Sequence, residues 1–350
     1  MAECANERYP VSVLTTADLD ALIADIEAEM GRIVANAEDE RTKPLYDMVR
    51  YSLGLDKGAS RGKRIRPLLG LLAYQSISGD YERALPGAAA VELGHNFSLV
   101  HDDIEDNGTE RRNRPALWIT EGVPQAINAG DTLFSLSRLA LHRLEEMGYP
   151  PAKILQLMRL YDDTCLALCE GQFMDIWTSE HLEWISVDYY FDMIGRKTAS
   201  LIAGAIQAAA MLATEDPAIV AAYRGFGWAV GLAFQLNDDL LGIWGDEAAT
   251  GKVPSDIATR KKTLPVIYAM EHAGPEDRER LSEIFAANHP SAAEVEETLG
   301  ILERTGARDY VRDRARSYRD EALAQLASVG VVDGTAMDRL RLIVVSAIAA

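Results

Sequence analysis

The stretch VELGHNFSLVHDDIED, from Val91 to Asp106, combines apolar residues with an acidic cluster at its end. Asp102 and Asp106 are four residues apart, which on a helix is about 6 Å along the axis and on one face. Carboxylates on a partly buried helix are costly unless cations neutralise them. The stretch therefore predicts a helix that binds a hard cation such as Mg²⁺, which takes oxygen ligands and shares them with phosphates.

A second segment repeats this design. In FQLNDDLLGIWGD, from Phe234 to Asp246, apolar residues at helical spacing lead into Asp238 and Asp239. A single acidic run is as often solvated surface charge as a metal site. Two such helices in one chain favour a Mg²⁺–diphosphate site over surface charge.

Basic residues accompany both acidic segments. Arginine matches phosphate oxygens with two parallel hydrogen bonds, and lysine acts as a mobile point charge. Each basic residue alone is typical of a protein surface, but as a set in a chain of net charge −19 they indicate an anionic ligand. They lie in GKRIRP at 62–67, at Arg111-Arg112, at Lys197-Thr198 and at Lys261-Lys262-Thr263.

Helical patterning predicts the fold class. The 350 residues are 48% hydrophobic, contain no Pro/Gly/Ser-rich linker, and show no alternation long enough for a sheet. We therefore expect one all-α domain over residues 1–350, a large helical bundle with a central active-site cavity between the two aspartate helices. Polar loops at 108–115 and 245–259 are expected to cover that cavity. Helices are expected at 16–37, 66–78, 91–106, 125–147, 152–178, 187–214, 218–244 and 263–273, and through the C-terminal third.

The charge balance excludes some classes of partner. A net charge of −19 argues against nucleic acid and against stable binding to an anionic membrane. The N-terminal residues contain no apolar signal segment, and the longest uncharged apolar run, Leu201–Ala213, is too short to span a bilayer. A cytoplasmic protein without stable membrane insertion is expected.

Taken in order, the motifs resemble those of the trans-isoprenyl diphosphate synthases, the polyprenyl synthetase family. The resemblance covers roughly Gly62 to Pro265. It runs through GKRIRP, LVHDDIED with the arginine pair, GQFMD at 171–175, KTASLIA at 197–203, FQLNDD, TGK and KKTLP. It implies the isoprenoid synthase type of helical bundle, usually as a homodimer.

The resemblance also implies roles for individual residues. The residues that it implies for catalysis are Asp102, Asp103, Asp106, Lys197, Asp238 and Asp239. Among them it implies that three hold a set of three Mg²⁺ ions: Asp102, Asp106 and Asp238. It implies that the allylic diphosphate is bound by Arg111, Lys197, Thr198, Gln235 and Lys261. It implies that isopentenyl diphosphate is bound by Lys63, Arg66, His95 and Arg112. Lys252 stands where the family has a further lysine in the substrate site.

The chain departs from the family pattern at three places. Gly242 stands where a full DDxxD has its last aspartate, and Asp246, one turn further, is a candidate replacement. Asn113 stands where the family usually has glycine, and Arg61 precedes Gly62 where the family has a second glycine. None of these changes removes a group that the chemistry needs.

The implied reaction is head-to-tail condensation of isopentenyl diphosphate with an allylic diphosphate. A single aromatic, Phe97, five positions before Asp102, followed by the small Ser98, resembles members that make geranylgeranyl diphosphate. Farnesyl diphosphate synthase is the alternative. A terpene cyclase of the same fold would not need Lys63 and Arg66, and a non-catalytic regulatory subunit would not need a complete first aspartate motif.

Overall fold

A computed structural model describes residues 16–56, 62–181, 184–245, 255–286 and 290–347. These residues divide into two compact units. The first unit comprises residues 1–163, 204–223 and 329–342, and the second comprises 164–203, 224–328 and 343–350. Four helices, α7, α9, α10 and α16, contribute residues to both units; they span Pro151–Glu180, Ser200–Ala213, Pro217–Trp244 and Gly334–Ala347.

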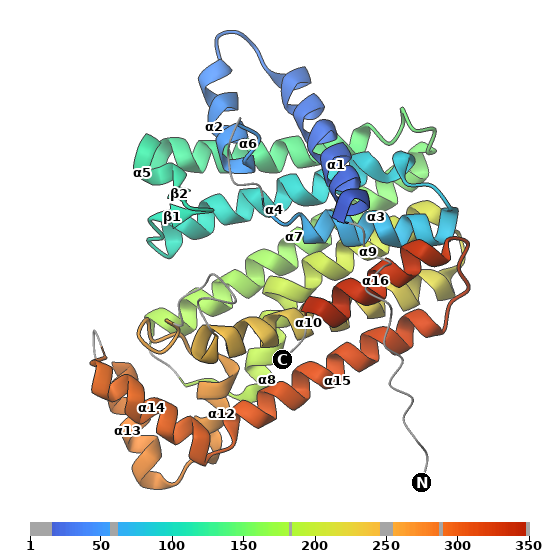
Figure 1. Cartoon of the computed structure of the whole chain (residues 1–350). Coiled ribbons are helices and arrows are strands. Elements are labelled where there is room, and N and C mark those ends of the chain that lie inside the picture. The colour runs from blue at the N-terminus through green and yellow to red at the C-terminus, as the bar shows by residue number, and fades with distance from the viewer. Residues whose placement is uncertain (1–15, 57–61, 182–183, 246–254, 287–289, 348–350) are drawn as a thin grey trace, which may run out of the picture. The chain divides into compact units, whose positions relative to one another are not determined.

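The first unit is built on α4, which carries the first acidic motif, and α6 packs along it (Figure 1). Gly130 of α6 permits this close packing, because a Cβ there would overlap the ring of His101 on α4. Gly94 of α4 makes room for α7, because a Cβ there would overlap the hydroxyl of Tyr161. The elements that lie wholly within this unit are α1 Thr16–Ala37, α2 Lys43–Leu53, α3 Ile65–Ser78, η2 Glu82–Ala84, α4 Leu85–Glu105, β1 Glu110–Arg111, β2 Arg114–Pro115, α5 Leu117–Glu121 and α6 Val123–His142.

The second unit holds the second acidic motif at the end of α10. Its further elements are α8 Val187–Ile194, the π-helical segment η3 Gly195–Ala199, α12 Leu264–His272, α13 Pro275–Ala286, α14 Ala292–Arg304 and α15 Ala307–Ala327. An apolar cluster joins the end of α10 to α12, α13 and α14 through Ile243, Val266, Leu281 and Ile301. The acidic end of α10 is therefore supported by a packed core.

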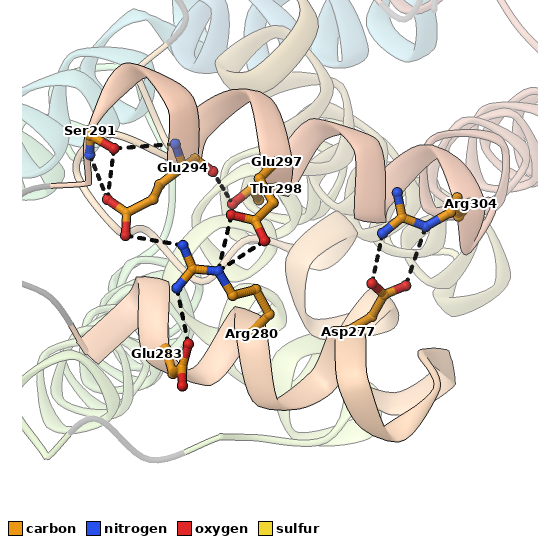
Figure 2. Close-up of polar contacts among 8 residues, drawn as sticks. All are labelled: Asp277, Arg280, Glu283, Ser291, Glu294, Glu297, Thr298 and Arg304. Atoms are coloured by element: carbon orange, nitrogen blue, oxygen red, sulfur yellow. Dashed lines mark hydrogen bonds and ion pairs between the residues drawn. The ribbon is translucent and has the colours of Figure 1, made fainter.

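Exposed ion pairs connect residues of α13 and α14, as Figure 2 shows. Arg280 contacts Glu283, Glu294 and Glu297, and Asp277 contacts Arg304. Exposed ion pairs add little stability, whereas burying a large apolar side chain contributes about 1.5–3 kcal/mol. The apolar cluster, rather than the ion pairs, therefore dominates the packing of this pair.

The all-α class is confirmed, and most expected helices have the predicted bounds within a few residues. The expected 187–214 helix is interrupted by η3, and the expected 125–147 helix ends at His142. Helix α2 was not predicted. Its signals are Pro44 near the start and the left-handed Gly54, φ 67°, that closes it. The single-domain assignment and the central cavity stay predictions.

Helix α10 has the length and composition of a membrane-spanning helix. Half of its most apolar window is buried in the structure, and a core helix of a soluble protein meets the same criteria. The length and composition of α10 are therefore only weak evidence for a membrane-spanning segment.

Candidate active site

Arg64 of GKRIRP is a structural residue. Its backbone adopts the left-handed conformation, φ 50°, and its side chain is fully buried. The guanidinium donates to Glu92 at 2.7 Å, to the Leu53 carbonyl at 2.5 Å and to Glu27 at 3.1 Å. These bonds stabilise the turn before α3. Arg64, the central basic residue of the motif, is therefore structural, whereas Lys63 and Arg66 can contact a ligand.

Arg66 and His95 form the first basic group. Arg66 Nη1 lies 3.0 Å from His95 Nε2. Burial, and then the positive charge of Arg66, lower the pKa of His95 well below its ordinary value, so the ring is neutral and accepts from Arg66. The buried Nε of Arg66 has no hydrogen-bond partner among the described residues. An anionic ligand would satisfy it.

Arg112 belongs to the same basic group. It lies in the two-residue turn between β1 and β2, where Arg112 and Asn113 both have positive φ, 56° and 60°. Type I′ turns require this conformation, and asparagine tolerates it better than most residues, which accounts for Asn113 in place of glycine. Arg112 donates to Ser52 O and Asn96 Oδ1, each at 2.9 Å.

The turn also brings Arg112 against the basic motif. A Cβ on Gly62 would lie only 3.1 Å from Arg112 Nη2. The structure thus brings Arg112 to the start of GKRIRP, while Lys63, one residue on, is exposed to solvent. Two sequence-predicted contacts to isopentenyl diphosphate therefore come from adjacent segments.

The aspartates of the first acidic motif lie in two different environments. Asp103 is buried and accepts from Arg111 Nη2 at 2.6 Å and from Nε at 3.1 Å. It therefore holds Arg111 in place. Asp102 is half-buried and Asp106 exposed at the end of α4, and their spacing puts them on one face with His95 and Ser98.

Asp239 of the second motif is also committed to the fold. It is 1% exposed and accepts from Tyr190 Oη, from Gln235 Nε2 at 3.1 Å and from Leu264 N at 3.0 Å. Burial raises its pKa to about 6 although the hydrogen bonds oppose that rise. It joins α10 to α8 and α12, whereas Asp238 beside it is half-buried.

Lys197 and Thr198 lie on η3, in the second unit. Lys197 Nζ pairs with Asp175 of GQFMD, and Thr198 Oγ1 donates to Gln235 Oε1 at 3.0 Å. Three motifs distant in sequence thus meet in one cluster. π-Helical turns are rare and often occur at functional sites.

Lys261 interacts electrostatically with the carboxylates of this cluster. Desolvation opposes its charge, but the carboxylates of Asp239, Asp256, Asp175 and Asp238 together raise its pKa. Lys261 therefore stays a cation suited to diphosphate. The predicted residues Lys252 and Asp246 lie outside the described residues.

Close glycine contacts hold η3 on both sides. A Cβ on Gly171 of α7 would lie 2.7 Å from Lys197 Cα, and one on Gly231 of α10 would lie 2.8 Å from Ala199 Cβ. The conformation of η3, and with it Lys197, depends on backbone approaching backbone at these points.

We expect Gly171→Ala to displace η3, because overpacking a tight contact costs about 1–3 kcal/mol. The variant should bind an allylic diphosphate about tenfold more weakly, measured by calorimetric titration, and melt at a lower temperature. Gly274→Ala is the matched control, since a Cβ there meets nothing within 4 Å. Equal affinities in both variants would contradict this role of Gly171.

Sequence reasoning missed several residues of the second cluster. Asp175 was visible in the GQFMD motif but had no role assigned. Tyr190 gave no signal, because an isolated tyrosine on a helix is usually a packing residue. Asp256 also gave none, because its neighbours come from distant segments.

The donor set suits Mg²⁺. Within the described ranges, no three His, Cys, Asp or Glu side chains cluster as a ready metal site. Mg²⁺ usually takes one or two carboxylates and completes its shell with phosphate oxygens and water. The oxygen donors of Asp102 and Asp106, one turn apart, fit that coordination.

Comparison with known proteins places this arrangement in a class. The family model for polyprenyl synthetases matches residues 29–302. A short chain isoprenyl diphosphate synthase of Methanothermobacter thermautotrophicus is 42% identical over 250 residues, which are 71% of this chain and 75% of that protein. A geranylgeranyl diphosphate synthase of Mycobacterium tuberculosis is 36% identical over 309 residues, 86% of this chain and 87% of that protein.

The fold gives the same result. The solved structure of geranylgeranyl pyrophosphate synthetase from Pyrococcus horikoshii has a TM-score of 0.86 at 31% identity, covering 95% of this chain and 98% of that one. The chain belongs to the polyprenyl synthetase family and has its all-α fold. It is an enzyme of the trans-prenyltransferase class.

Proposed function

We propose that this enzyme condenses isopentenyl diphosphate with an allylic diphosphate, in a Mg²⁺-dependent reaction, to give geranylgeranyl diphosphate. The observation that carries the proposal is the presence of two basic groups, one in each compact unit. One contains Arg66, His95 and Arg112, and the other contains Lys197 and Lys261. A cyclase, which ionises one diphosphate, would need only one.

The residues of the second group would hold the allylic diphosphate. Lys197 and Lys261 bring charge to it, and Thr198 and Gln235 orient it by hydrogen bonds. Asp102, Asp106 and Asp238 would hold Mg²⁺, which stabilises charge on the leaving diphosphate as the allylic C–O bond breaks. We propose a set of three ions.

The first group would position the second substrate. Arg66 and Arg112 would bind isopentenyl diphosphate, and neutral His95 keeps Arg66 aligned. The double bond would then attack the allylic cation, and the released diphosphate would accept the proton whose loss completes the product. None of the assigned side chains needs to be a covalent nucleophile. Apolar helix walls matter because water would quench the cation.

Incubation with isopentenyl diphosphate, Mg²⁺ and each allylic primer in turn tests the proposal. Chromatography of the hydrolysed products should show elongated prenyl alcohols and consumption of isopentenyl diphosphate. Cyclic hydrocarbons formed without isopentenyl diphosphate would indicate a cyclase. A lack of turnover with every primer would indicate a regulatory subunit.

Product length is proposed to depend on the face of α4 that carries Asp102. Ser98 and Val91 lie on that face, and Val91 lines a pocket between α3, α4 and α9 whose volume is about 280 Å³ with the solvent at its opening included. Its walls are apolar and mostly glycine and alanine: Pro67, Gly70, Leu71, Ala84, Gly87, Ala88, Val91, Ala205, Ala208, Ala209 and Leu212. Phe97 instead packs on Phe134 and His101, at ring distances of 5.2 and 5.3 Å.

We expect Ser98→Phe to shift the main product from geranylgeranyl to farnesyl diphosphate, because the ring would block the path to this cavity. Phe97→Ala should lengthen the products by a smaller shift. Product chromatography measures both. Ser98→Ala, which leaves the path open, is the control. An unchanged product in Ser98→Phe would contradict the proposal that this face of α4 limits product length.

A homodimer is proposed because apolar side chains remain exposed. In the first unit these are Ile119, Val123 and Ile127, and in the second they are Leu166 and Phe173. A second copy of the chain would remove them from water. We propose that the enzyme acts in the cytoplasm; sedimentation and cell fractionation test both statements.

A further inference from the structure

The hairpin of β1 and β2, which carries the arginine pair, borders a pocket. The pocket lies between the end of α2, α4 and the hairpin, and its volume is about 430 Å³ with the solvent at its opening included. Its apolar lining includes Leu99, Val100 and Leu117. Side chains that face open space lose contacts on that side, so apolar packing alone does not fix the orientation of the hairpin. Polar contacts at the rim of the pocket must contribute to it.

Tyr51, in the last turn of α2, makes two of these rim contacts. Its hydroxyl donates to the Pro115 carbonyl on β2 at 2.8 Å. The guanidinium of Arg114, also on β2, lies over the Tyr51 ring at 3.7 Å from its centroid. Arg114 in addition pairs with Asp56, shortly after α2, at 3.1 Å. Tyr51 thus joins β2 to the end of α2 through both its hydroxyl and its ring.

The position of Arg112 depends on this attachment. Arg112 is half-buried in the turn that β2 follows, and it donates to the carbonyl of Ser52, the residue after Tyr51. Burial, and then the positive charge of Arg64, lower the pKa of Arg112, and Arg111 also repels it. These repulsions favour an outward movement of Arg112, and the attachment of the hairpin to α2 opposes that movement.

Arg111 is held in a different way. Asp103 accepts from two of its nitrogens, at 2.6 and 3.1 Å, so a charged pair attaches Arg111 directly to α4. Arg112 has a neutral acceptor on α4, the Asn96 side chain at 2.9 Å. Hydrogen bonds between charged partners are roughly twice as strong as neutral ones. Loosening the hairpin from α2 should therefore displace Arg112 more than Arg111.

We propose that Tyr51 is a positioning residue that fixes the hairpin, through Pro115 and Arg114, so that Arg112 can bind isopentenyl diphosphate. The proposal rests on the proposed function, because that function assigns Arg112 to this substrate. Tyr51 acts without touching the substrate. Its loss should weaken the binding of isopentenyl diphosphate selectively and leave kcat nearly unchanged.

Separate calorimetric titrations of isopentenyl diphosphate and of an allylic diphosphate test the proposal, with a melting curve for each variant. We expect Tyr51→Ala to bind isopentenyl diphosphate about tenfold more weakly, because it loses a hydrogen bond and a cation–π contact. Tyr51→Phe keeps the ring beneath Arg114, so its loss should be only about threefold. Affinity for the allylic diphosphate should stay within about twofold of the wild type in both variants, because Asp103 still holds Arg111.

A double variant shows whether Tyr51 acts through Arg112. In an Arg112→Ala background, adding Tyr51→Ala should change the affinity for isopentenyl diphosphate by less than about twofold, because the group that it positions is already absent. A further loss of about tenfold in that background would overturn the inference. Arg114→Ala, which takes the guanidinium away from the Tyr51 ring, should give the same selective loss, and it serves if Tyr51→Ala fails to fold.

Tyr46→Ala is the matched control. Tyr46 is a half-buried tyrosine on the same helix, and it is not among the residues that line the pocket. Its replacement should leave both affinities at wild-type values. Wild-type affinity for isopentenyl diphosphate in Tyr51→Ala and Arg114→Ala would overturn the inference. Equal losses for both substrates would overturn it as well, because they would indicate a general structural role.

Failure of this inference and failure of the proposed function give different results. If wild-type enzyme elongates no primer, the proposed function fails, whatever the titrations show. If the wild type elongates primers and Tyr51→Ala binds isopentenyl diphosphate normally, only the role of Tyr51 fails.

Discussion

Replacing Asp102 or Asp238 with alanine is expected to lower turnover about a thousandfold and to leave the fold intact. Each of these aspartates would hold a Mg²⁺ ion, and the positive charge of that ion would stabilise the leaving diphosphate by several kcal/mol. The apo protein should not lose stability, because both residues lie in crowded acidic runs where removing one charge relieves repulsion. Steady-state assays with a single allylic primer, together with melting curves, measure both effects.

Glu105 offers a matched control. It lies in the same acidic run and is exposed, yet it has no proposed role at the metal. Glu105→Ala should keep nearly full turnover. Activity within tenfold of the wild type in Asp102→Ala or Asp238→Ala would show that the metal assignment is wrong.

Asp103 and Asp239 are expected to behave differently from their neighbours. Asp103 holds Arg111 through two of its nitrogens, and Asp239 joins three helices. Their loss should therefore lower the melting temperature as well as activity. The sequence analysis named all four aspartates as catalytic and assigned only Asp102 and Asp238 of them to the metal. It could not show that Asp103 and Asp239 are held by Arg111 and Tyr190, which come from other segments.

Local patterns were enough to predict most of the fold. Helical periodicity and the residues at helix ends located α1, α3, α7 and α10 to within a few residues. They could not locate η3, because its π-helical turn depends on Gly171 and Gly231, which come from other helices. Tertiary contact overrides local preference at such a point.

The motifs likewise predicted which residues carry the chemistry, but not how they are held. The role of Arg64 could not be predicted, because its acceptors are Leu53, Glu27 and Glu92 on three other segments. The position of Asp256, whose carboxylate a Cβ on residue 242 would overlap, could not be predicted for the same reason. These contacts join residues distant in sequence, and a single chain contains no signal for them.

Alanine at Lys63 or Arg66 is expected to weaken binding of isopentenyl diphosphate, whereas alanine at Lys197 should weaken binding of the allylic diphosphate. Each lost charge-assisted contact is worth about 1.5–3 kcal/mol, or roughly tenfold to a hundredfold in affinity. Arg66 should show the larger effect of the first pair, since Arg66 is half-buried with its Nε fully buried, while Lys63 is exposed.

Separate calorimetric titrations with each substrate measure these affinities. Lys43→Ala removes an exposed lysine paired with Asp47 on α2, and it controls for a general change in charge. The two groups are predicted to act independently because Arg66 contacts His95 and Lys197 contacts Asp175, and the described residues show no partner common to both. Equal losses for both substrates in all three variants would mean that one basic surface serves both diphosphates, and would contradict the two-site assignment.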